Sequence, residues 1–363
     1  MSHDKVEKWI RPEIRALSAY HVPEPGEMIK LDAMENPYHW PEDMVNEWFD
    51  VLKNVELNRY PDPSAKKLTE QLRKAMAVPE GADIILGNGS DELIQMIALA
   101  LSGNRAGKEC SMLSVDPGFV MYRMIATFAA MDYVGVPLNE DFSLNETAVL
   151  NAIELHQPAV VFIAYPNNPT GNLFDEYSIK RIVETAPGVV IVDEAYHAFA
   201  DNSFMPLVND YDNLLVMRTV SKMGLAGLRL GLLAGNPKWL HEFDKVRLPY
   251  NINILTQASA EFAMRHVAVL EQQTQQICTD REILFNQLKQ IEGLHVFPSK
   301  ANFILVRVAE GQADIIFNKL KELGVLIKNL NSAGGLLKDC LRITVGTPEE
   351  NQKFMQAFKK TLS

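Results

Sequence analysis

The chain has 363 residues, of which 47% are hydrophobic and 22% charged, a composition typical of a globular protein and a length sufficient for two domains. Its 35 basic and 46 acidic residues give a net charge of −11, which argues against non-specific nucleic-acid binding but allows a local basic pocket. No apolar run approaches the roughly 18 residues that a membrane-spanning helix requires, and residues 1–9 lack the apolar core of a signal peptide.

The cysteines and histidines indicate neither a metal site nor a redox centre. Cys110, Cys278 and Cys340 have no spacing typical of either, and the eight histidines form no His-Glu-x-x-His pattern. We therefore expect thiols in a reducing cytoplasm and no bound metal.

The predicted elements divide the chain into three parts. Residues 1–42 are rich in proline and irregular, like an arm that lies across a partner subunit. Residues 43–249 alternate between strands and helices, which predicts a large α/β domain with a mostly parallel seven-stranded sheet covered on both faces. The candidate strands are Ile84–Gly87, Ser111–Val115, Tyr133–Val136, Val160–Ala164, Val189–Asp193, Leu214–Arg218 and Arg229–Ala234.

The pattern changes near Tyr250, where residues 250–363 begin. A long amphipathic helical region over 255–291 is expected to link the large domain to a small C-terminal α+β domain. The strands expected in that domain are Phe303–Val308, Val325–Ile327 and Leu341–Thr344.

The first strand, Ile84–Gly87, runs into a glycine turn that opens a helix. Backbone N–H groups of Gly89, Ser90 and Asp91 at that helix start are suited to a phosphate. The turn is a poor dinucleotide fingerprint because Glu92 stands where a third glycine belongs. An ordinary capped helix N-terminus explains the same residues equally well.

A later strand, Val160–Ala164, ends in a rigid turn that contains two prolines and a glycine, Tyr165 to Gly171. The turn holds Asn168 at the strand end, where its amide can reach a ligand oxygen. A plain Asn-Pro turn is the alternative, although the full run is difficult to obtain by chance.

The next strand, Val189–Asp193, is buried and apolar, and it places Asp193 at its carboxyl end, where open α/β sheets bind ligands. A carboxylate there can keep a pyridine nitrogen protonated, and Tyr196 can donate to a phenolic ring oxygen. The alternatives are a helix cap or a magnesium-binding carboxylate, but the second requires a P-loop that the sequence lacks.

Lys222 follows the apolar run Leu214–Met217 and is flanked by anion-binding side chains, namely Thr219, Ser221 and Arg229. A lysine that attacks a carbonyl needs a lowered pKa, which burial and a neighbouring cation supply. Lysine, phosphate ligands and a buried site together indicate a Schiff base with pyridoxal 5'-phosphate (PLP). Taken alone, the Ser-Lys pair is more typical of a solvated strand end.

In this order, these motifs resemble the fold-type I PLP-dependent aminotransferases. The resemblance implies that Lys222 forms the covalent internal aldimine and that Asp193 pairs with the pyridine nitrogen. It also implies that Asn168 and Tyr196 contact the ring oxygen region and that Arg229 binds the cofactor phosphate.

The resemblance adds two aromatic residues to the cofactor site. Phe119, in Asp116-Pro117-Gly118-Phe119, matches the residue that stacks on the ring. Tyr60, in Arg59-Tyr60-Pro61, matches a tyrosine that each subunit of a homodimer lends to its neighbour's cofactor phosphate.

Within the family, the chain is similar to the histidinol-phosphate aminotransferases, a class II type branch. The stretches that carry this similarity are Leu31–Tyr38, Arg59–Asp62, Gly87–Glu92 and Leu341–Asn351. The resemblance implies that Arg342, Lys328, Tyr20, Asn36 and Asn168 contact substrate.

Two positions depart from the pattern of that branch. Lys328 stands where many relatives have a second phosphate-binding arginine; lysine binds phosphate without bidentate geometry. The stretch from Lys222 to Arg229 is one residue shorter than in many aminotransferases, which we interpret as a tolerated loop difference.

The function implied is amino transfer from L-histidinol phosphate to 2-oxoglutarate, giving imidazole-acetol phosphate and glutamate in histidine biosynthesis. A threonine-phosphate decarboxylase and an aromatic amino-acid aminotransferase are alternatives of the same fold. A ligand sensor in a transcription regulator would need an added basic helix-turn-helix, which we do not expect here. A structural protein with a dead site is disfavoured by the intact Lys222, Asp193, Asn168 and Arg229.

Overall fold

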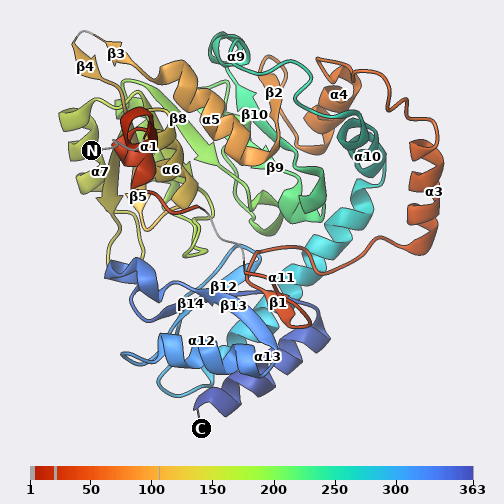
Figure 1. The fold of residues 1–363 in the computed structure, drawn as a ribbon, viewed down its shortest axis with the longest axis vertical. Helices are drawn as coiled ribbons and strands as arrows, with labels where there is room; N and C mark the ends of the chain where they lie inside the picture. Colours follow the sequence, from red (N-terminus) through yellow and green to blue (C-terminus); the bar gives the residue numbers. More distant parts are fainter. Residues whose placement is uncertain (1–4, 20–22, 106, 363) are drawn as a thin grey trace.

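A computed structural model describes residues 5–19, 23–105 and 107–362. The chain forms two lobes, each built around its own sheet, and one long helix, α11 (Val267–Lys289), runs between them (Figure 1). The α/β class and the mostly parallel seven-stranded sheet predicted from the sequence are confirmed. Among the described residues, no helix combines the length and apolar character needed to cross a bilayer.

The seven-stranded sheet of the larger lobe has the order β2-β10-β9-β8-β7-β5-β6. Its strands are β2 (Asp83–Gly87), β5 (Ser111–Asp116), β6 (Asp132–Pro137), β7 (Val160–Ala164), β8 (Val189–Asp193), β9 (Leu214–Thr219) and β10 (Gly231–Gly235). Only β10 runs antiparallel to its neighbours, β9 and β2. The other strands therefore end at the same edge of the sheet.

Both faces of this sheet are covered because successive residues of a strand point to opposite sides. In β8, Val190 and Val192 enter one apolar cluster and Val189 and Ile191 enter the other. The first face packs on α4 (Lys66–Ala75), α7 (Glu146–His156) and α8 (Glu176–Thr185). The second face packs on α5 (Gly89–Leu101), α6 (Val120–Phe128) and α9 (Pro237–Asp244).

The smaller lobe contains a five-stranded sheet of order β1-β13-β14-β12-β11. Its strands are β1 (Ile29–Leu31), β11 (His295–Val296), β12 (Phe303–Arg307), β13 (Val325–Asn329) and β14 (Cys340–Thr344). Helices α12 (Ala313–Glu322) and α13 (Pro348–Leu362) pack on it with α11. Strand β1 comes from the N-terminal part of the chain and pairs in parallel with β13, so this part completes the sheet of the smaller lobe.

The helical region that links the lobes consists of two helices rather than one. Helix α10 (Ile254–Arg265) packs on α3 (Glu42–Leu52) and α4, and α11 begins after a break at His266. The remaining elements are helices α1 (Lys5–Trp9) and α2 (Pro12–Arg15), strands β3 (Asn104–Arg105) and β4 (Lys108–Glu109), and short 3-10 turns at His197–Phe199, Met205–Leu207, Ser221–Met223, Ala226–Leu228, Asn331–Ala333 and Gly335–Leu337.

Candidate active site

Strand register brings the motif residues together at one edge of the large sheet. Asp193, the last residue of β8, is paired with Ala164 on one side and Met217 on the other. The Asn168 turn and the Lys222 segment therefore leave the sheet on either side of Asp193. On the far side of β9, Gly231 pairs with both Thr219 and Gly87, which brings Arg229 and the glycine turn to the same edge.

A cavity of about 110 Å³ lies at this edge. The predicted residues that line it are Ser90, Asp91, Phe119, Asn168, Asp193, Tyr196, Thr219, Ser221, Lys222 and Arg229. The structure thus gathers around one space side chains that come from six separate segments of the sequence.

Lys222 lies in a short 3-10 turn directly after β9, and its Nζ is 3.5 Å from the backbone oxygen of Ala33. Burial lowers the pKa of Lys222 to about 8, and the nearby Arg342 and Arg229 cations act in the same direction. The amine is therefore deprotonated far more readily than an ordinary lysine, as a nucleophile toward an aldehyde must be.

Asp193 is buried and accepts two hydrogen bonds from the protein. The hydroxyl of Tyr122 donates to Oδ2 at 2.7 Å, and the backbone N–H of Ala195 donates to Oδ1 at 3.0 Å. Burial raises the pKa of Asp193 to about 6, while these two donors oppose the shift by stabilising the carboxylate.

A cluster of anion-binding groups occupies the end of the cavity next to helix α5. Gly89 has φ +76°, a backbone conformation that favours glycine, and Arg229 Nη2 lies close to it. Arg229 donates to Asp91 Oδ2 at 3.1 Å and remains half-exposed. The hydroxyls of Thr219 and Ser221 lie 2.9 Å apart beside them. The helix start, the cation and the hydroxyls together suit a phosphate.

Asn168 and Phe119 also line a second, larger cavity of about 750 Å³ that reaches toward the small lobe. Arg342 is buried there and donates to Asn168 Oδ1 at 2.6 Å and to the backbone oxygen of Asp32 at 3.0 Å. The guanidinium also lies 5.2 Å from the ring centre of Phe303, which holds its plane.

Lys328 faces the same cavity from β13. Its Cα is paired directly with that of Arg342 on the adjacent antiparallel strand β14. Directly opposed residues share one face of a sheet, so the two cations stand side by side over the cavity.

Of the predicted residues that the structure describes, Gly89, Tyr60 and Asn36 do not line either cavity. Tyr60 is highly exposed and stacks on Tyr250, with ring centres 4.5 Å apart. The amide of Asn36 donates to Met223 O and Gln273 Oε1, and its oxygen accepts from Tyr38 N, so it holds the N-terminal segment beside the Lys222 turn. Tyr20 lies outside the described residues.

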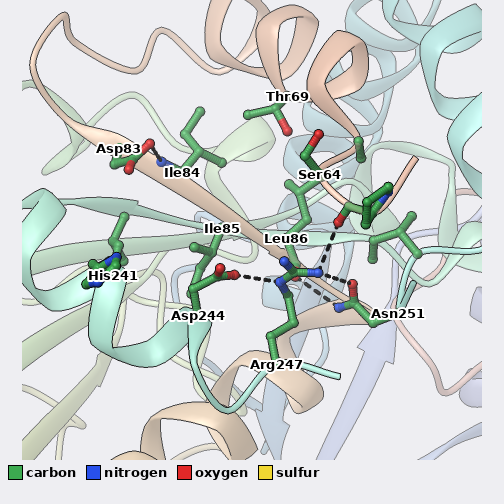
Figure 2. A pocket seen from close by; sticks show the side chains of 14 residues that line it. Ser64, Thr69, Asp83, Ile84, Ile85, Leu86, His241, Asp244, Arg247 and Asn251 are labelled. Carbon is green, nitrogen blue, oxygen red and sulfur yellow. Dashed lines mark hydrogen bonds and ion pairs between the residues drawn. The ribbon is translucent and has the colours of Figure 1, made fainter. Parts of the chain in front are cut away.

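A third cavity, of about 210 Å³, lies beside β2 and is lined in part by residues 63–65, which follow Tyr60 closely in the sequence (Figure 2). Arg247 donates to Asp244 Oδ1 at 2.6 Å, to Asn251 Oδ1 at 3.2 Å and to the backbone oxygen of Pro63 at 3.1 Å. Asn251 in turn donates to Glu92 of α5 at 2.8 Å. This chain of bonds connects the segment that carries Tyr60 to the helix at the phosphate end of the first cavity.

The family model for aminotransferase class I and II matches residues 26–358. The chain belongs to the class I and II aminotransferases. It is 56% identical over 359 residues to histidinol-phosphate aminotransferase 2 of Nitrosococcus oceani, covering 99% of each chain. It is 50% identical over 362 residues to histidinol-phosphate aminotransferase 2 of Cupriavidus pinatubonensis, covering 98% of this chain and 97% of that protein.

Solved structures of class I and II aminotransferases share the fold at lower identity. The crystal structure of a histidinol-phosphate aminotransferase from Sinorhizobium meliloti in complex with pyridoxal-5'-phosphate superimposes with a TM-score of 0.85 at 21% identity, covering 98% of this chain and 97% of that one. The enzyme from Clostridium acetobutylicum gives a TM-score of 0.83 at 22% identity, covering 92% and 98%.

Sequence reasoning missed two groups around this aminotransferase site. Tyr122 follows Phe119 by one helical turn, and a buried tyrosine requires a hydrogen-bond partner, but only the fold identifies Asp193 as that partner. Glu194 and Arg218 form a buried ion pair at 2.7 Å that joins the ends of β8 and β9. The available signal was a charged residue at the end of each strand, Glu194 after Val189–Asp193 and Arg218 after Leu214–Met217.

Proposed function

We propose that this protein transfers the amino group of L-histidinol phosphate to 2-oxoglutarate, using pyridoxal phosphate, in histidine biosynthesis. The observation that carries the proposal is the pairing of Lys328 and Arg342 over the cavity that adjoins Lys222. Two neighbouring cations suit a phosphate dianion better than a single carboxylate. The naming of the similar proteins as histidinol-phosphate aminotransferases supports the same substrate.

The residues of the first cavity fit pyridoxal phosphate. Lys222 supplies a buried amine of lowered pKa for the aldehyde, and Asp193 supplies a buried carboxylate for the pyridine nitrogen. The Gly89 turn, whose positive φ favours glycine, lies close to Arg229 and supplies a cradle for the phosphate. When bound, the cofactor provides an aldehyde that captures the substrate amine and a ring that withdraws electrons from the adjacent carbon.

The remaining chemistry belongs to side chains of this protein. The Nζ of Lys222 is the base that removes the proton from the carbon bearing the amino group of the substrate. Asp193 places a buried carboxylate next to the ring nitrogen and keeps that nitrogen protonated. Tyr196 is buried in the same cavity, and its ring lies 5.7 Å from Lys222 Nζ.

Arg342 is the anchor shared by both substrates. Its planar guanidinium binds the phosphate of histidinol phosphate in one half-reaction and a carboxylate of 2-oxoglutarate in the other. Lys328 adds a point charge that favours the phosphate. Asn168, which accepts from Arg342, connects this anion site to the cofactor cavity.

A homodimer completes the proposed enzyme. The exposed Tyr60, stacked on Tyr250 and held by the Arg247 bonds to its segment, is available to reach the cofactor phosphate of a neighbouring subunit. The cytoplasm is the proposed location, in keeping with the cysteine pattern of the sequence.

Single-turnover spectroscopy of the purified, cofactor-loaded protein tests the proposal. Histidinol phosphate is expected to remove the visible absorbance of the loaded protein rapidly. Phenylalanine is expected to remove the same absorbance far more slowly. Lys222→Ala is expected to lose both this absorbance and turnover, whereas exposed Lys353→Gln keeps both. Faster reaction with phenylalanine or tyrosine would instead establish an aromatic aminotransferase, and release of carbon dioxide from threonine phosphate would establish a decarboxylase.

A further inference from the structure

Tyr122 is the buried neighbour of Asp193 that the proposed chemistry leaves without an assignment. It lies in the first turn of α6, is fully buried, and donates its hydroxyl to Asp193 Oδ2 at 2.7 Å. Such a short bond from a neutral donor to a carboxylate is among the stronger hydrogen bonds in proteins.

The aromatic ring of Tyr122 is held on two sides. It stacks on Phe162 of β7, with ring centres 4.8 Å apart and planes inclined by 21°. The ring of Phe119, which lines both the first and the second cavity, meets the ring of Tyr122 edge-on, with ring centres 5.5 Å apart. Because both contacts restrict rotation of the ring, the hydroxyl has a fixed position relative to β8.

Two donors on different oxygens fix the plane of a carboxylate. Tyr122 holds Oδ2 of Asp193, and the N–H of Ala195 holds Oδ1 at 3.0 Å. A carboxylate has about four acceptor positions, so each oxygen keeps capacity for a further donor. Because Asp193 lines the cavity, we expect a ligand bound in the cavity to donate to these remaining acceptor positions.

We propose that Tyr122 is a positioning residue that orients the Asp193 carboxylate, and preserves its negative charge, for the pyridine nitrogen of the cofactor. Tyr122 acts through Asp193 and contributes no group to the reacting atoms. The inference deepens the proposed function and rests on the assignment of Asp193 to that nitrogen.

The test is the protonation of the cofactor nitrogen, measured by ¹⁵N NMR of protein loaded with pyridoxal phosphate labelled at the ring. Tyr122→Phe removes one oxygen and keeps the stacked ring. The nitrogen is expected to lose its proton at a pH roughly one to two units lower than in the unaltered protein, the shift that corresponds to one charge-assisted hydrogen bond. Turnover should fall with little change in KM, because the bond acts on the reacting state.

Two further proteins frame this measurement. Tyr165→Phe alters another buried tyrosine, whose ring packs on Phe204. Tyr165 bonds to the backbone oxygen of Asp193 through its own backbone N–H, which the change keeps, so this variant should titrate like the unaltered protein. Replacing Tyr122 with 3-fluorotyrosine strengthens the hydrogen-bond donor without changing the packing. This change should raise the midpoint pH at which the cofactor nitrogen loses its proton. This second variant keeps the test decisive if Tyr122→Phe does not fold.

Asp193→Asn separates failure of the inference from failure of the proposed function. If Asp193→Asn lowers the midpoint strongly while both Tyr122 variants titrate like the unaltered protein, the positioning role is wrong and the Asp193 assignment stands. If Asp193→Asn also leaves the midpoint unchanged, Asp193 is not the partner of the nitrogen and both ideas fall.

Discussion

At the scale of single residues, the site depends on ionisable groups that burial moves away from their ordinary behaviour. Lys222 is more readily present as the neutral amine because burial disfavours its charged form and two arginines lie nearby, which together lower its pKa to about 8. Burial raises the pKa of Asp193 to about 6, and the hydrogen bonds from Tyr122 and Ala195 act in the opposite direction. The same low-polarity environment thus supports a neutral amine and demands hydrogen bonds for a carboxylate.

The lowered pKa of Lys222 predicts how cofactor-free protein takes up pyridoxal phosphate. Only the neutral amine attacks the aldehyde, so the rate of attachment should rise with pH and level off above a midpoint near 8, well below the 10.5 of an ordinary lysine. Stopped-flow absorbance across a pH series measures this midpoint. Arg342→Gln removes one of the cations and should move the midpoint upward; a midpoint near 10.5 in the unaltered protein would contradict the prediction.

At the scale of elements, adjacent strands set which side chains cooperate. The register of β13 on β14 places Lys328 opposite Arg342, and the register of β8 on β9 places Asp193 beside the Lys222 segment. The buried ion pair between Glu194, directly after β8, and Arg218, near the end of β9, joins the two strands next to Asp193. The carboxyl ends of β8 and β9 therefore have little freedom to move apart.

Lys328→Gln should weaken the reaction with histidinol phosphate more than the reaction with 2-oxoglutarate. The lysine charge acts mainly on a phosphate, and losing a hydrogen bond to a charged group lowers kcat/KM roughly 10-fold to 100-fold. Steady-state kinetics with each substrate varied in turn measure the difference. Lys353→Gln, an exposed lysine of α13, serves as the control, and equal losses for both substrates would argue against a phosphate site at Lys328.

Arg218→Met should lower the free energy of unfolding by about 3 to 5 kcal/mol, because it leaves the fully buried Glu194 carboxylate without its counter-charge. Urea unfolding of the cofactor-free protein measures the change. Lys338→Met breaks an exposed pair with Glu310 of the same 2.7 Å length and should leave the free energy of unfolding nearly unchanged. Similar losses in the two variants would show that burial does not govern the Glu194 pair.

At the scale of the whole molecule, the two lobes contribute different parts of the site. The large sheet supplies the proposed cofactor residues, and the smaller lobe supplies Arg342 and Lys328 across the second cavity. The N-terminal part of the chain joins the smaller lobe through β1 and contacts the Lys222 turn through Asn36 (Figure 1). The exposed Tyr60 remains available for a second subunit.

Mixing two impaired variants tests the shared site. Lys222→Ala has no attachment lysine, and Tyr60→Ala lacks the residue lent to the neighbour. A mixed dimer contains one site with Lys222 from one chain and Tyr60 from the other. At limiting cofactor, refolding the two variants together should give activity above that of either variant alone. The control replaces Tyr60→Ala with Tyr177→Ala, which alters an exposed tyrosine of α8. Mixing Lys222→Ala with Tyr177→Ala should give no activity above that of Tyr177→Ala alone. Absence of any gain with Tyr60→Ala would remove the claim that Tyr60 crosses the interface.

Local patterns were sufficient to predict the large sheet, and together with the family resemblance they named most of the residues that line the first cavity. Apolar runs such as Val189–Val192 predict buried strands from composition alone, and parallel strands place the residues at their carboxyl ends on one edge. For this reason Asp193, Asn168 and Lys222 were recognisable before the structure was known. The helical region expected over 255–291 consists of two helices that meet at His266, a break that no proline or glycine announces.

Contacts between distant segments followed from the folded chain and not from local pattern. Tyr122 and Asp193 are separated by 71 positions, Arg342 and Asn168 by 174, and β1 and β13 by nearly the length of the chain. Residue type and spacing encode local conformation and burial, so they reveal which side chains end a strand. Which of those side chains meet depends on strand order, register and the packing of one lobe on the other, and these are properties of the whole chain.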